Sequence, residues 1–88
     1  MLPGAEIIDK GIDDLKARSE TVESLLVSIG SQRLRNAGVQ VPRETFPSPE
    51  HRLYEMLRSE DPHTAHSRYN ALIRRLVSFE RAASCAKK

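Results

Sequence analysis

The residues with the clearest capacity for chemistry are arginines near the end of the chain. Arg74 and Arg81 are seven residues apart, and Arg68 and Arg75 form a second pair with the same spacing. Seven residues are close to two helical turns, so each pair would lie along one side of a helix. Guanidinium groups aligned in this way can contact phosphates or an acidic protein surface. The alternative interpretation is a solvated helix face.

A second set of polar side chains lies on a predicted short helix over residues 31–38, and it consists of Gln32, Arg33, Arg35 and Asn36. The order of helix, glycine turn and short helix over residues 21–39 resembles the helix-turn-helix motif. That resemblance implies base contacts by amides and arginines in a DNA groove. The stretch departs from the motif at Leu26, where a small residue is usual, and at Asn36, where an apolar residue is usual. The alternative is a helical corner with a hydrated polar face.

Histidine and acidic side chains cluster between the last two predicted helices. The cluster comprises Glu60, Asp61, His63 and His66, with His51 upstream. Two histidines and a carboxylate could hold zinc, but a structural zinc site needs four ligands at a defined spacing. No glycine-rich phosphate loop is present, and Cys85 has no histidine close to it in sequence. The sequence therefore predicts no metal, no cofactor and no catalytic residue.

Length and composition predict one small folded domain over residues 1–88, with residues 1–4 and 84–88 as frayed ends. The chain has 88 residues, of which 39% are hydrophobic and 30% are charged. A domain of this size has room for one modest core. Its single cysteine fits a reducing compartment, so we expect a cytoplasmic protein. Neither a signal-peptide pattern nor an apolar run of membrane-spanning length is visible.

Charge is distributed unevenly along the chain, although the net charge is only +2. Residues 1–30 hold three basic and six acidic side chains, whereas residues 31–88 hold eleven basic and six acidic ones. This asymmetry is compatible with ordinary solvated helix faces. It also predicts, as the sharper alternative, that the second part of the chain meets an acidic partner.

Apolar spacing and capping signals predict the helices. A first helix follows Pro3-Gly4, and a second begins after Ser19 as N-cap and ends at Gly30, which can take the left-handed conformation. A third, capped by Ser31, is short, and residues 39–47 form an extended linker. Ser48-Pro49 and Asp61-Pro62 each combine an N-cap with proline at the first helical position, so they start a fourth helix and a fifth. The fifth is expected over residues 62–83 as the spine of the fold.

The apolar side of this last helix is unusually wide. Its apolar residues cover an arc of about 160°, whereas a helix covered from one side needs about 100°. Glu80 lies inside the arc, where a buried carboxylate should find a cation or a hydroxyl. We therefore expect a homodimer in which the last helices meet. The candidate contact comprises Tyr69, Ile73, Val77 and Glu80.

These patterns predict an all-α fold, a compact array of four to five helices with a long C-terminal helix as spine. Leu25, Leu26, Ile29, Leu53, Leu57, Leu72, Ile73 and Leu76 are its predicted core. The expected function is non-catalytic: a small adaptor or regulator that binds a macromolecular partner, most simply a protein. One alternative is a DNA-binding regulator that reads through residues 31–36. A small enzyme or enzyme subunit is the third.

Overall fold

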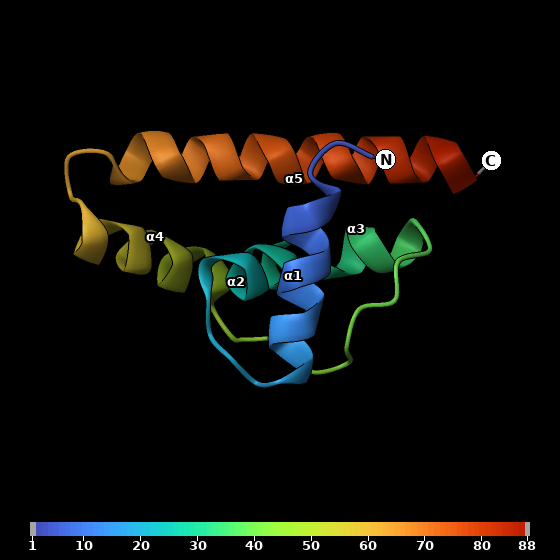
Figure 1. The fold of residues 1–88 in the computed structure, drawn as a ribbon, viewed down its shortest axis with the longest axis horizontal. Helices are drawn as coiled ribbons and strands as arrows, with labels where there is room; N and C mark the ends of the chain where they lie inside the picture. The colour runs from blue at the N-terminus through green and yellow to red at the C-terminus, as the bar shows by residue number, and fades with distance from the viewer. Residues whose placement is uncertain (1, 88) are drawn as a thin grey trace.

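Five α-helices build the described part of the chain, which confirms the predicted all-α class. The computed structural model describes residues 2–87 and places no strand among them. The helices are α1 (Ala5–Lys16), α2 (Val22–Ile29), α3 (Ser31–Asn36), α4 (Pro49–Glu60) and α5 (Ala65–Lys87). Figure 1 shows α5 running along one side of the molecule, with α4 returning antiparallel beneath it and α1 crossing the array. The long C-terminal helix therefore spans the fold as the predicted spine.

The most deeply buried helix is α2. Every residue from Ser24 to Ser28 is buried, because α1 packs on one side of α2 and α4 on another. The remainder of the core comes from the other four helices and includes Ile8, Leu15, Leu34, Leu53, Leu57, Ala65, Leu76, Phe79 and Ala83. Of the predicted core residues, Ile29, Leu72 and Ile73 are only half-buried. These three lie at the borders of the apolar stripes, where the neighbouring helices cover them incompletely.

The crossing of α1 over α2 depends on Gly11. A Cβ atom at this position would overlap the backbone carbonyl oxygen of Glu23 and would lie 2.5 Å from Cγ2 of Val27. The two helix backbones are therefore closer than any side chain at residue 11 would allow. This close approach is what buries Ile8 and Leu15 against α2.

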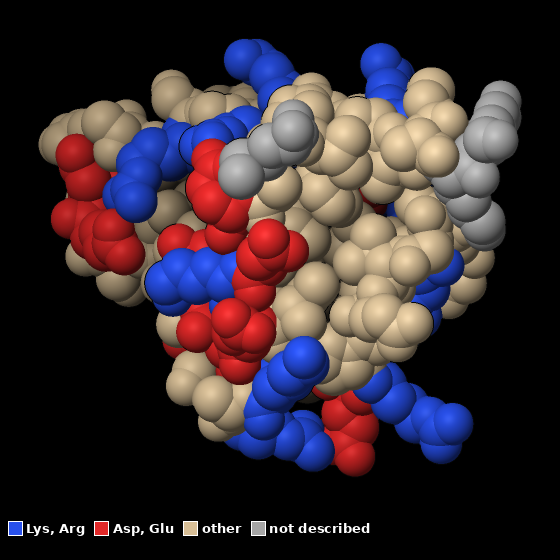
Figure 2. Space-filling model, turned by 45° about the vertical axis from the view of Figure 1, so that its right-hand side comes forward, with Lys and Arg blue, Asp and Glu red and all other residues tan. Residues whose placement is uncertain are grey.

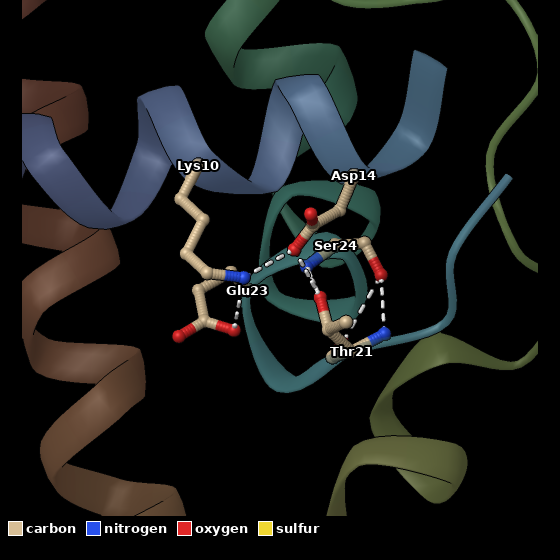
Figure 3. A network of polar contacts seen from close by, with 5 residues as sticks. All are labelled: Lys10, Asp14, Thr21, Glu23 and Ser24. Atoms are coloured by element: carbon tan, nitrogen blue, oxygen red, sulfur yellow. Dashed lines mark hydrogen bonds and ion pairs between the residues drawn. The ribbon is translucent and has the colours of Figure 1, made fainter. Parts of the chain in front are cut away.

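Helix α2 begins at Thr21 rather than after Ser19, the N-cap expected from the sequence. The Thr21 hydroxyl accepts a hydrogen bond from the Ser24 N–H (3.1 Å), and the Ser24 hydroxyl accepts one from the Thr21 N–H (2.8 Å). The Thr21 hydroxyl also donates to Asp14 of α1 (2.6 Å), which is bonded to Lys10 (2.8 Å) (Figure 3). These bonds lower the pKa of the Asp14 carboxyl, with the Lys10 bond as the larger cause. Thr21 is therefore the N-cap of α2, because it is hydrogen-bonded to both Ser24 and Asp14.

Replacing Thr21 should test this assignment. We expect Thr21→Ala to lower the free energy of unfolding by about 1–2 kcal/mol, because it removes a cap and a bond between helices. Ser19→Ala is the matched control and should be near neutral, since Ser19 is exposed and lies outside the helix. Urea unfolding followed by circular dichroism measures both values. A larger loss in the Ser19 variant would place the cap where the sequence suggested.

Three other residues at helix ends, Gly30, Ser48 and Asp61, do not have the roles that the sequence predicts. Gly30 ends α2 with φ −95°, outside the left-handed region, and Ser31 is already the first residue of α3. Ser48 does precede α4, but it has φ 47° and makes no side-chain cap bond. Asp61 accepts a bond from the His63 N–H (3.0 Å) within a turn, so α5 starts at Ala65 instead of Pro62.

The start of the described chain packs beside α5, and α5 itself forms the end of the described chain. Leu2 packs against the core, and Gly4, with φ +78°, lies against the carbonyl oxygen of Arg75. Helix α5 continues through residues 84–87, which the sequence assigned to a frayed end. Met1 and Lys88, in the same two predicted ends, lie outside the described residues. Fraying itself stays a prediction.

The connection between α3 and α4 is extended, as predicted, and is held to the helices by specific contacts. The Arg35 guanidinium donates to the carbonyl oxygen of Pro42 (2.6 Å). The Phe46 N–H donates to the hydroxyl of Ser28 in α2 (3.3 Å), and Arg18 pairs with Glu44 (2.6 Å). This segment therefore closes the side of the core opposite α5.

Candidate partner-binding groove

A groove of about 380 Å³ lies between α3 and the C-terminal half of α5. Its walls are formed by Arg33, Asn36, Ala37, Val77, Glu80, Arg81 and Ser84. It brings two exposed arginines and a buried carboxylate together beside the apolar side chains of Ala37 and Val77. Of the grooves in the described structure, this one is lined by a buried charge. Arg33 and Arg81 belong to separate sets of candidate residues in the sequence, and the fold brings them to one groove.

Glu80 lies on the floor of this groove. Only 8% of the residue is exposed, and its Oε2 atom accepts no hydrogen bond from residues 2–87. The Nε atom of Arg33 is 3.4 Å from Oε2, which makes an ion pair but a poorly directed contact. The expected cation for Glu80 is therefore present, and it comes from α3 of the same chain.

Gly30 makes room for this carboxylate. A Cβ atom on Gly30 would lie 2.6 Å from Oε2 of Glu80 and 2.9 Å from Cδ1 of Leu76. Glycine is thus needed here for close approach to α5 rather than for a left-handed turn. The sequence signal of a glycine between two helices was correct, but its physical reason was different.

The environment of Glu80 disfavours its ionised form. Burial raises the pKa of its carboxyl above the ordinary value, and the charge of Arg33 offsets this only in part. A raised pKa in the folded state means that ionised Glu80 reduces stability at neutral pH. Stability from this group is therefore greatest below the ordinary carboxyl pKa and is lost as the pH rises through the raised value.

Replacing Glu80 with a neutral residue should reveal how much its buried charge lowers the stability. We expect Glu80→Gln to be more stable than the wild type by about 1 kcal/mol at neutral pH, because burying a neutral amide costs less than burying a carboxylate. The difference should close as the pH falls to about 4, where the wild-type carboxyl is also protonated. Urea unfolding across this range measures it. Glu55→Gln, at an exposed pair with Arg58, is the control. A Glu80→Gln variant that is less stable at neutral pH would show that the ion pair outweighs desolvation.

The contact with Glu80 leaves the far end of Arg33 free. Nε is the atom that faces the carboxylate, and the side chain remains 66% exposed. Its two terminal nitrogens make no hydrogen bond within the described part of the chain. These nitrogens form the end of the guanidinium fork, which matches the two oxygens of a carboxylate.

The predicted basic side of α5 divides into paired and unpaired arginines. Arg68 pairs with Glu60 (3.0 Å), and Arg75 pairs with Glu6 of α1 (3.2 Å). Arg74 and Arg81 are exposed, and neither side chain has an ionic or hydrogen-bond partner among residues 2–87. The seven-residue spacing alone does not distinguish Arg68 and Arg75 from Arg74 and Arg81. The structure separates them, because the acidic partners come from other helices.

The side chains proposed for DNA reading are largely engaged within the protein. Gln32 donates to Asn36 (3.3 Å), Arg35 holds the linker, and Arg33 pairs with Glu80. Only Gly30 separates α2 from α3, whereas the helices of the DNA-binding motif are joined by a turn of three or four residues. Base reading by this helix stays a prediction, and it would require several of these bonds to break.

The four residues of the predicted dimer contact are partly used within one chain. Tyr69 packs edge-on against Tyr54, with ring centroids 5.8 Å apart, and Ile73 packs against the core. Glu80 is buried, which leaves half-buried Val77 at the groove. The wide apolar arc is thus buried at Ala65, Leu76, Phe79 and Ala83 and half-buried at Tyr69, Leu72, Ile73 and Val77. The homodimer stays a prediction, and the surface left for its contact is smaller than the sequence suggested.

The histidine cluster does not converge. His66 bonds to Asn70 of the same helix (3.2 Å), and His51 and His63 are exposed. Within the described residues, no three histidine, cysteine or acidic side chains are placed to share a metal ion. Cys85 is exposed on α5. Over the same part of the chain, no helix combines the length and apolar character that crossing a membrane requires.

No protein-family model, curated protein or solved structure matches this chain.

Proposed function

We propose that this protein is a non-catalytic adaptor or regulator that binds an acidic segment of a protein partner. The binding surface is the exposed side of α5 together with the groove between α3 and α5. The observation that supports it most directly is that Arg74 and Arg81 remain unpaired in a fold that pairs their neighbours Arg68 and Arg75. Two helical turns separate them, about 10 Å along the axis, a span that a short peptide segment can follow.

The charge pattern of the surface supports an acidic rather than a basic partner at this site. Figure 2 shows acidic side chains gathered over α1 in the middle of the face in view, and basic ones along its upper edge, beside the acidic ones and at its lower end. The exposed acids of α1 are Glu6, Asp9 and Asp13. A partner segment with carboxylates would be drawn to α5 and turned away from α1, which fixes its position.

A protein segment fits this surface better than nucleic acid does. Strong binding to a nucleic-acid backbone usually needs many phosphate contacts, and α5 offers two unpaired arginines. The acidic side chains of α1 would repel a long polyanion that extends past α5. Ala37 and Val77 add an apolar contact beside the arginines, which suits a mixed acidic and apolar peptide.

A binding role without catalysis is supported by the content of the groove. Among the described residues, the one carboxyl with a raised pKa belongs to Glu80, which lies beside a guanidinium, and neither histidine nor cysteine is among the residues lining the groove. We also propose that the protein works in the cytoplasm, where its single exposed Cys85 would stay reduced.

The experiment compares two double variants that remove the same charge. One is Arg74→Gln with Arg81→Gln, and the control is Arg68→Gln with Arg75→Gln, whose arginines are already paired. The probe is a fluorescein-labelled short peptide of glutamate and serine around a central leucine, measured by fluorescence anisotropy. A second peptide with glutamine in place of glutamate reports contacts that do not depend on charge.

We expect the acidic peptide to bind the wild type, and the first variant to lose about tenfold or more in affinity, since each lost contact involves charged groups. The control should lose much less. Equal losses in both variants, or no binding of the acidic peptide, would contradict the proposal. Preferential binding of duplex DNA would favour the DNA-binding alternative. Sedimentation equilibrium of the free protein tests the homodimer, which would give twice the monomer mass.

A further inference from the structure

We infer that Arg33, positioned by Glu80, forms with Arg81 a binding site for one carboxylate of the partner inside the groove between α3 and α5. This inference rests on the proposed function and assigns it a specific anchor. The ligand group is the side chain of an aspartate or glutamate in the acidic segment. Glu80 acts as a positioning residue, because it touches Arg33 and not the ligand.

The first step is the fixed location of Glu80. Its Oε2 atom occupies the space that Gly30 leaves by lacking a Cβ, and it is enclosed there beside Leu76. Leu34 of α3 is fully buried, which holds α3 against the rest of the fold. The carboxylate therefore cannot move far from the start of α3, so any side chain bound to it is held at this place.

The second step is the contact that Arg33 makes with Glu80. Its Nε atom lies 3.4 Å from Oε2 of Glu80, an ion pair without a hydrogen bond, and the side chain stays 66% exposed. A contact through Nε leaves the terminal nitrogens as a two-pronged donor. Such a fork binds a carboxylate through two parallel hydrogen bonds, which a mobile arginine achieves only after it loses conformational freedom.

The third step is the charge of the site. Arg33 and Arg81 carry two positive charges and Glu80 at most one negative charge, so the groove favours an anion over a cation. Ala37 and Val77 lie beside the arginines and can pack against the methylene groups of an aspartate or glutamate side chain. A volume of about 380 Å³ admits a side chain and its flanking backbone.

A positioning role and a purely electrostatic role for Glu80 predict opposite effects of its removal on peptide binding. If Glu80 acted only through its charge, its removal would strengthen the binding of an acidic peptide. If Glu80 holds Arg33 in the binding orientation, its removal weakens binding, although the site becomes more positive. The sign of the change therefore separates the two roles.

The experiment measures the same acidic peptide against Arg33→Gln, Arg33→Lys and Glu80→Gln. The control is Arg43→Gln, which removes an exposed arginine that does not line the groove. We expect a loss of about tenfold for Arg33→Gln and a clear loss for Arg33→Lys, which keeps the charge without the fork. Glu80→Gln should lose about threefold to tenfold, and Arg43→Gln little. Circular dichroism verifies that each variant remains folded.

A pH profile adds a readout that a purely structural role would not move. The probe is the same peptide with cysteic acid in place of glutamate, so that the ligand stays ionised in mild acid. Glu80 is the titrating side chain in the groove, because its charged neighbours are Arg33 of α3 and Arg81 of α5, which stay protonated. We expect binding to weaken on acidification in the wild type and to remain level in Glu80→Gln.

Two results would overturn the inference. One is unchanged or stronger peptide binding in Glu80→Gln, and the other is normal binding by Arg33→Gln. If either occurs while the Arg74 and Arg81 variant still loses affinity, the proposed function stands and only the groove anchor is wrong. If no acidic peptide binds the wild type, the proposed function and this inference fail together.

Discussion

Gly11→Ala should lower the free energy of unfolding by about 3 kcal/mol, a large part of the stability of so small a domain. The new Cβ would overlap the carbonyl oxygen of Glu23 and the side chain of Val27. Backbone cannot rotate away as a long side chain can, so α1 must shift off α2. In an isolated helix the same change would be stabilising by about 0.5–1 kcal/mol, because alanine favours helix over glycine.

The control for this prediction is Asp13→Ala, two residues further along α1 at an exposed position. It gains the helix preference of alanine without meeting α2, and it should be neutral or slightly stabilising. Thermal unfolding followed by circular dichroism measures both variants. A Gly11→Ala variant that melts at or above the wild-type temperature would show that α1 does not cross α2 as closely as the structure places it.

Leu76→Ala should lower the free energy of unfolding by about 2–5 kcal/mol. Leu76 is 1% exposed, and its methyl groups lie against the backbone at Gly30, so it joins α5 to the junction of α2 and α3. Truncation leaves a cavity that the backbones of α5 and of the α2–α3 junction cannot fill without moving. The result is measured by urea unfolding at neutral pH.

Leu72→Ala, one helical turn earlier on α5, is the matched control for Leu76. Leu72 is half-buried on the border of the apolar arc, so its truncation should cost clearly less. If Leu76→Ala melted within a few degrees of the wild type, or if the two costs were reversed, the face of α5 assigned to the core would be wrong.

Much of the fold could be predicted because it depends on local signals. Apolar spacing placed α1, α2 and α5, and the proline after Ser48 marked the start of α4. The identity of the N-cap at α2 could not be predicted, because Ser19 and Thr21 are both good caps and the choice depends on bonds from Ser24 and Asp14. Likewise, no local pattern shows that Gly11 sits at a helix crossing.

The candidate site was predictable only in parts. Glu80 was noticed because a carboxylate on an apolar helix face needs a cation. Its partner Arg33 is 47 positions away in the chain, so the pairing depends on tertiary structure. The division of the arginines into paired Arg68 and Arg75 and unpaired Arg74 and Arg81 depends in the same way on where Glu60 and Glu6 come to lie.

The claim that α5 and the α3–α5 groove bind an acidic partner segment can be tested directly by nuclear magnetic resonance. Backbone amide signals of the ¹⁵N-labelled protein would be followed as the acidic glutamate, serine and leucine peptide is added. We expect the changes to concentrate on residues 33–37 of α3 and its end and on residues 74–84 of α5. Changes centred on α1 or α4, or no change at a peptide concentration well above that of the protein, would contradict the claim.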